Sequence, residues 1–192
     1  EKPFFRRPHL PRFPNIPIIR TFQTEPQTKR PNHKDHTMTL HAQWQNAPLG
    51  DITAHIVPRY HETHRSQLAA MIEAGEALDG TAGFPDDFVP LVQAIQNELL
   101  SHMMKEERIL FPMIENGAGS GAAMPIRMMM HEHGDHQGAI GQLAAVTGNF
   151  TAPDNAGEAW RQLYALAKQF ADDLAEHIEL EDNILFARTL AS

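Results

Sequence analysis

The chain has 192 residues with a formal net charge of −8, and 42% of its residues are hydrophobic, which suffices for one domain with a substantial core. Cysteine is absent, so disulfides, a thiol nucleophile and cysteine-ligated clusters within the chain are excluded. No apolar run approaches the roughly 18 residues of a membrane-spanning helix. Twelve histidines accompany 24 Asp and Glu residues, a surplus that favours iron, zinc or manganese if the chain binds a metal.

The beginning of the chain differs in composition from the rest. Residues 1–37 carry eight Lys and Arg against three acids and contain seven prolines. Recurrent proline prevents a regular helix or a central strand, so we predict a disordered basic tail over residues 1–43, with a targeting peptide as the alternative. Residues 38–192 carry 21 acids against eight Lys and Arg, which argues against a nucleic-acid partner.

Residues 44–192 predict one all-α domain, an up-down-up-down four-helix bundle. Turn-rich breaks separate four long segments that are rich in helix formers, and each segment opens near a proline. The expected helices cover residues 48–78, 85–115, 124–147 and 153–188. Pro58 lies inside the first of them and predicts a kink. Short connections make sequential neighbours antiparallel.

Two of these segments repeat one another. HMMKEERILFP, from His102, aligns without a gap with HIELEDNILFA, from His177, and pairs Glu106 with Glu181. A His and a Glu four residues apart share one face of a helix, and here the rest of that face is apolar. A buried ionised carboxylate is costly unless it is paired or binds a cation. The repeat therefore favours a metal site.

His61 and His133 lie on similar apolar stripes of the other two helices. Counted from one end of the bundle, the four histidines share one level, roughly 14–20 Å from that end, and the two glutamates lie about one turn lower. Any one of these residues alone is more simply a hydrogen-bonded core residue or a surface residue, but their convergence favours a two-metal centre. The predicted ligands are His61, His102, Glu106, His133, His177 and Glu181.

Other polar residues near these six are expected outside the ligand set. His64 and His136 are predicted at the rim of the site or in contact with its ligands. Glu107 and Asp182 are predicted to point away into solvent, and the run Met128–Met130 is more typical of core packing than of metal binding. The histidines expected to be solvated are His9, His33, His36, His55 and His131.

From Trp44 to Leu190 the chain resembles the iron–sulfur cluster repair di-iron proteins, a branch of the hemerythrin-like domains. The resemblance rests on the segments WQNAPLGDITAHIVPRYHETHRSQL, ELLSHMMKEERILFPMI, EHGDH and DDLAEHIELEDNILFARTL. It implies the same six residues as ligands of two non-haem iron ions, bridged by the glutamates and an oxo group. It also implies a non-enzymatic stress protein that helps repair iron–sulfur clusters damaged by nitric oxide or peroxide, with one labile iron to donate.

The resemblance further implies a cytoplasmic protein. Its expected partners are damaged iron–sulfur proteins, with nitric oxide or oxygen as ligands, neither nucleic acid nor membrane, and a homodimer as an open alternative. Longer family members carry a small N-terminal domain with adjacent cysteines, where this chain has a cysteine-free segment, and Ala187 stands where the family usually has proline.

Two other functions stay open. One is a hemerythrin-like carrier or sensor of oxygen or nitric oxide, and the other is a di-iron oxidase or reductase. Reversible oxygen carriage in hemerythrins uses a histidine-richer site, so four histidines favour repair.

Overall fold

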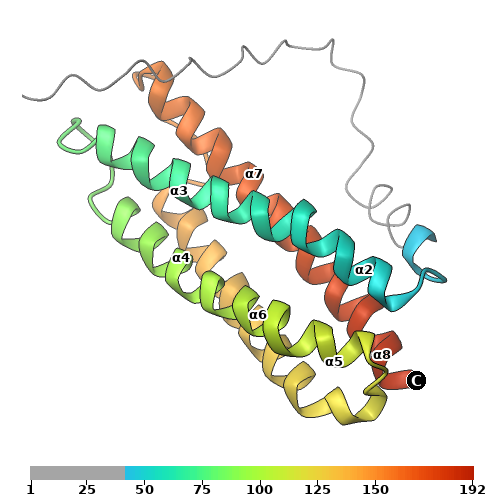
Figure 1. Cartoon of the computed structure of the whole chain (residues 1–192). Coiled ribbons are helices and arrows are strands. Elements are labelled where there is room, and N and C mark those ends of the chain that lie inside the picture. The colour runs from blue at the N-terminus through green and yellow to red at the C-terminus, as the bar shows by residue number, and fades with distance from the viewer. Residues whose placement is uncertain (1–41) are drawn as a thin grey trace, which may run out of the picture.

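Four long helical rods, packed side by side, make up the domain (Figure 1). The computed structural model describes residues 42–192, and these form helices and turns without a strand. The all-α class and the antiparallel four-helix order predicted from the sequence are confirmed. The prediction of a disordered tail falls on residues that lie almost entirely outside this range, and the boundary at residue 43 stays a prediction.

Three of the rods are composite. Rod 1 consists of α2 (Leu49–Ile56), η1 (Val57–His61) and α3 (Glu62–Ala77). Rod 2 consists of α4 (Phe88–Lys105), η2 (Glu106–Leu110) and α5 (Phe111–Glu115), and the short helix η3 (Gly119–Ala122) leads into rod 3, which is α6 (Ala123–Val146). Rod 4 consists of α7 (Glu158–Leu180), η4 (Glu181–Phe186) and α8 (Ala187–Ala191).

Rod 4 begins later than the sequence predicts. Pro153 was expected in its first turn, but α7 starts at Glu158. The backbone N–H of Ala156 donates to the Pro153 carbonyl at 2.9 Å, and Gly157 is extended with ψ of 167°. The proline therefore opens a turn that precedes the helix. Pro48 likewise lies just before its helix, with ψ of 141°, and directly precedes Leu49, the first residue of α2.

Wide π-helical turns interrupt rods 1, 2 and 4. Pro58, where the sequence predicts a kink, lies in the π turn η1, because proline has no N–H to continue the helical ladder. The turns η2 and η4, which the sequence did not predict, begin at Glu106 and Glu181. A π turn contains an extra residue and shifts the phase of the helix after it. The apolar stripe that contains His102 and Glu106 predicts a buried Ile109, but this residue is 55% exposed and Leu110 is buried.

The apolar core is divided into two clusters along the rods. One cluster includes Leu68, Met71, Phe88, Leu99 and Phe170. The other includes Ile52, Ile56, Leu110, Phe111 and Phe186. The predicted metal ligands lie where the two clusters meet along the rods, so apolar packing borders the polar layer on both sides and makes unpaired charge costly.

The methionine run of rod 3 packs only in part as expected. Met129 is buried at 3% exposure, whereas Met128 and Met130 are 57% and 42% exposed. Consecutive residues of a helix point in different directions, so one position of three meets the core. None of the helices formed by residues 42–192 is long and apolar enough to cross a membrane.

Candidate metal centre

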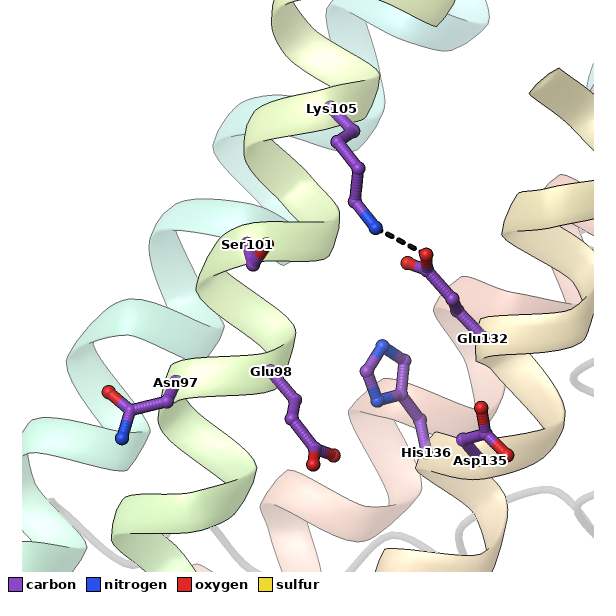
Figure 2. A pocket seen from close by; sticks show the side chains of 7 residues that line it. All are labelled: Asn97, Glu98, Ser101, Lys105, Glu132, Asp135 and His136. Carbon is purple, nitrogen blue, oxygen red and sulfur yellow. Dashed lines mark hydrogen bonds and ion pairs between the residues drawn. The ribbon is translucent and has the colours of Figure 1, made fainter.

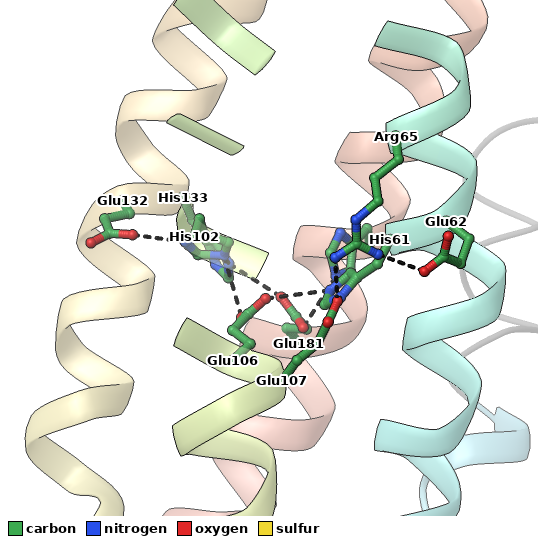
Figure 3. A network of polar contacts seen from close by, with 10 residues as sticks. His61, Glu62, Arg65, His102, Glu106, Glu107, Glu132, His133 and Glu181 are labelled. Carbon is green, nitrogen blue, oxygen red and sulfur yellow. Dashed lines mark hydrogen bonds and ion pairs between the residues drawn. The ribbon is translucent and has the colours of Figure 1, made fainter. Parts of the chain in front are cut away.

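The structure brings together all six residues that the sequence singled out. They come from all four rods, and each is at most 1% exposed. Figure 3 shows the polar network around them and labels all but His177. Their potential ligand atoms form two overlapping groups, each with all its atoms within 4.8 Å of one another. Both groups contain the two glutamates. We define half-site A by its histidines, His61 and His177, and half-site B by His102 and His133.

Each glutamate faces both half-sites. Glu106 places Oε2 3.4 Å from Nε2 of His61 in half-site A and Oε1 3.3 Å from Nε2 of His102 in half-site B. Glu181 places Oε1 3.1 Å from Nε2 of His177 in half-site A and Oε2 3.2 Å from Nε2 of His133 in half-site B. The two carboxylates therefore span the gap between the half-sites, which is the geometry of a pair of bridging ligands.

The inner atoms of this cluster lack partners of their own. Within residues 42–192, both side-chain oxygens of Glu106 and of Glu181, and Nε2 of His61 and of His177, are buried without a hydrogen bond. Burying a carboxylate without compensation costs several kcal/mol or more, on the order of the penalties measured for isolated charges. Cations placed between the imidazoles and carboxylates would remove this cost, and this donor set suits iron, zinc or manganese. The residues present fit a pair of metal ions.

Electrostatics keep the glutamates ionised. Burial and mutual repulsion raise the pKa of Glu106, but the nearby imidazoles outweigh both, so that its pKa lies below the usual value. Burial also raises the pKa of Glu181, but His177 and His133 hold it well below the usual value. Burial opposes the charged form of His133, yet the carboxylates of Asp182 and Glu181 beside it raise its pKa to about 10. Because a metal ligand must be a neutral imidazole, metal binding here would release protons.

An outer layer of carboxylates holds three of the four histidines. Nδ1 of His61 donates to Glu107 at 2.7 Å, and Nδ1 of His133 donates to Asp182 at 2.8 Å. The prediction that Glu107 and Asp182 point away into solvent is wrong, because the residue after each inner glutamate faces the neighbouring rod. Such contacts fix the tautomer that leaves Nε2 available to a metal.

The outer layer includes one residue that the sequence analysis missed. Nδ1 of His102 donates to Glu132 at 2.9 Å, and Glu132 also pairs with Lys105. The signal in the sequence was weak, since Glu132 directly precedes His133, whereas the outer carboxylates Glu107 and Asp182 directly follow the inner glutamates. Its contact with rod 2 depends on how rods 2 and 3 pack.

His64 and His136 are buried beside the cluster, as expected for contacts of the ligands. The ring centroid of His64 lies 5.4 Å from that of His177, and that of His136 lies 4.9 Å from that of His102. Burial and the neighbouring imidazoles lower the pKa of His64 to about 3 and that of His136 to about 4. Both side chains are therefore neutral near pH 7, and neither belongs to the two ligand groups.

A chain of hydrogen bonds, also missed from the sequence, orients His64. Its Nδ1 lies 3.3 Å from Oε1 of Gln67, whose amide donates to Asp173 at 2.7 Å. Asp173 in turn accepts from Arg59 at 2.9 Å. These residues connect the surface of rods 1 and 4 to the edge of half-site A.

The other histidines match the prediction only in part. His131 is exposed and solvated as expected. His55 is half-buried, with its ring centroid 4.7 Å from that of Trp44. His9, His33 and His36 lie outside the described residues.

A polar pocket of about 580 Å³ opens between α4 and α6 beside half-site B (Figure 2). Lys105 and Glu132 pair across it, and His136 forms part of its wall. The pocket is thus next to half-site B through Glu132, which accepts the hydrogen bond of His102. Its other lining residues are Asn97, Glu98, Ser101 and Asp135.

Comparison with known proteins agrees with this geometry. Residues 53–189 match the model of the hemerythrin HHE cation binding domain. The iron-sulfur cluster repair protein DnrN of Neisseria gonorrhoeae is 50% identical over 157 residues, which cover 81% of this chain and 100% of that protein. The iron-sulfur cluster repair protein YtfE of Dickeya chrysanthemi is 44% identical over 151 residues, covering 77% of this chain and 68% of that protein. YtfE of Edwardsiella ictaluri is 41% identical over 160 residues, covering 81% and 72%.

The family match extends over more than half of the chain and contains all six residues of the cluster. The family resemblance found in the sequence is thereby confirmed. A buried layer of imidazoles and carboxylates, in a four-helix bundle, is what a cation-binding domain of this kind requires. The chain belongs to the family of hemerythrin HHE cation binding domains.

Proposed function

We propose that this chain is a di-iron protein that helps repair iron–sulfur clusters damaged by nitrosative or oxidative stress, by donating iron. The observation that carries the proposal is the pair of buried glutamates, each of which faces both half-sites. The names of the relatives, which are iron-sulfur cluster repair proteins at 41–50% identity, support repair over gas carriage.

In this proposal His61 and His177 hold one iron, and His102 and His133 hold the other. Glu106 and Glu181, which face both half-sites, would be shared by the two ions, and the family resemblance implies an oxo group between them. The bound ions supply redox-active iron that is also the cargo. Two imidazoles and two shared carboxylates leave each ion short of a full set of protein ligands, so a chelator or a recipient protein has a position to attack.

The proposed recipients are damaged iron–sulfur proteins in the cytoplasm, and the chain acts as a monomer or a homodimer without catalysing turnover of a small substrate. Nitric oxide and oxygen are proposed ligands of the iron. A hemerythrin-like sensor or carrier of these gases is the second candidate, because the same open positions that release iron also admit a diatomic ligand.

The test is recovery of a [4Fe–4S] dehydratase damaged by nitric oxide. The reduced, iron-loaded protein should lose iron to a moderate chelator and should restore the dehydratase, whereas a His133→Leu variant should do so poorly. His131→Leu serves as the matched control, because this exposed histidine lies on the same rod. Stable, reversible oxygenation without recovery of the dehydratase would overturn the proposal. Recovery of the dehydratase by iron-free protein would show that the metal centre of this chain is not responsible for the repair.

A further inference from the structure

Each half of the bundle contains one histidine, and the two histidines have the same kind of surroundings. In rods 1 and 2, His61 donates to Glu107 and lies against Phe111, with ring centroids 5.8 Å apart and planes at 20°. In rods 3 and 4, His133 donates to Asp182 and lies against Phe186, at 5.9 Å and 9°. One carboxylate and one phenyl ring from the adjacent rod hold each imidazole. Half-sites A and B thus each contain one histidine anchored in the same way.

The remaining histidines, His102 and His177, break this repetition. The residue before His133 is Glu132, and it accepts the hydrogen bond from Nδ1 of His102 at 2.9 Å. The equivalent residue before His61 is Tyr60, which stacks on His177 with ring centroids 5.0 Å apart and planes at 7°. Nδ1 of His177 is buried and has no hydrogen-bond partner among residues 42–192.

This single difference bears on metal affinity. A carboxylate that accepts the Nδ1 proton makes the imidazole a more basic ligand and orients its ring, and loss of such a contact typically lowers metal affinity about 10–100-fold. The ring of Tyr60 restricts His177 by packing but offers its Nδ1 no acceptor. Half-site B therefore has two anchored histidines and half-site A has one.

We propose that half-site B is the tight site and half-site A the loose one, so that the first iron to bind occupies the His102–His133 side. Given the proposed donation of iron, the ion that leaves at equilibrium is the one held by His61 and His177. The pocket beside half-site B affects how fast iron exchanges there, but it does not alter the order of the equilibrium affinities.

The test locates one equivalent of iron. Iron-free protein is loaded anaerobically with one Fe²⁺ per chain and brought to equilibrium before crystallisation, and anomalous diffraction at the iron edge gives the occupancy of each half-site. We expect occupancy at half-site B to exceed that at half-site A roughly tenfold or more. In the Glu132→Gln variant the two occupancies should become comparable, since the stronger acceptor of His102 is lost. Asp135→Asn, which removes another acid of the same pocket, should keep the wild-type ratio.

Equal occupancy in the wild type, or more iron at half-site A, would overturn the proposal. So would a preference for half-site B that persists unchanged in Glu132→Gln. Because occupancy is measured without a recipient protein, a failure here is distinct from a failure of the repair assay. A chain that restores no dehydratase can still show the ordered loading, and a chain that restores it can lack this order.

Discussion

Rods 2 and 4 carry the same His–Glu repeat but differ in what surrounds it. In both rods the glutamate is fully buried and opens a wide turn. Three residues further on, Ile109 of rod 2 is 55% exposed, whereas Ile184 of rod 4 is 1% exposed. The polar pocket is lined by residues of rods 2 and 3. The repeat therefore specifies the side chains that face the centre, and the packing of the rods decides the surroundings of each copy.

The largest expected effect is the same for both copies of the repeat. Replacing Glu106 or Glu181 with Leu should remove at least one metal ion per chain, because each carboxylate faces both half-sites. Elemental analysis of the purified variants measures this loss. The control is Asp172→Asn, which removes an exposed acid of rod 4 that pairs only with Lys168 at the surface. Full metal content in both Leu variants would refute the bridging assignment.

Metal removal should destabilise the protein through the buried His–Glu pairs, an effect that an ordinary apolar core would not show. Chelation should lower the thermal midpoint of the wild type, because both glutamates are left buried without compensation. The double variant Glu106→Leu/Glu181→Leu should not respond to the chelator. It should be more stable than the metal-free wild type by about 1–4 kcal/mol, the gain seen when apolar residues replace buried ionic groups. Calorimetry with and without chelator checks both points, and a response of the variant to chelation would contradict them.

A smaller effect is expected at the carboxylates that directly follow Glu106 and Glu181 in the sequence. Glu107→Gln weakens the acceptor of His61 in half-site A, and Asp182→Asn that of His133 in half-site B. Each should reduce metal affinity about 10–100-fold at its own half-site, measured by competition with a chelator of known affinity. Unchanged affinity in both variants would mean that these residues do not contribute to metal binding.

Residues 1–37 should have the smallest effect. Their proline spacing and low apolar content leave little surface to offset the entropy of ordering. A chain that starts at Met38 should keep the metal content and the thermal midpoint of the full chain. A fall of several degrees in the midpoint would show that the segment packs on the bundle.

The rods and the inner cluster could be predicted because both follow from helical periodicity. Polar residues such as His102 and Glu106 on an apolar stripe mark a buried site, whatever the details of packing. The wide turns could not be predicted, because the two segments align without a gap and both are equally compatible with a regular α-helix. The exposure of Ile109 could not be predicted either, since the equivalent Ile184 of rod 4 is buried.

The outer carboxylates were misjudged for a related reason. Glu107 and Asp182 were assigned to solvent by the geometry of an isolated helix, but each lies within hydrogen-bond distance of a histidine on another rod. Such contacts depend on how two rods approach each other. The stacking of Tyr60 on His177 is of the same kind, since no local pattern connects two residues so far apart in the chain.

The most direct test of the two-metal centre is the iron content of the purified wild-type protein, measured together with its near-ultraviolet absorption. Six converging side chains that form two groups sharing both glutamates predict two iron ions per chain and an oxo-to-iron charge-transfer band. One iron per chain, or a full complement of zinc without that band, would contradict the di-iron assignment.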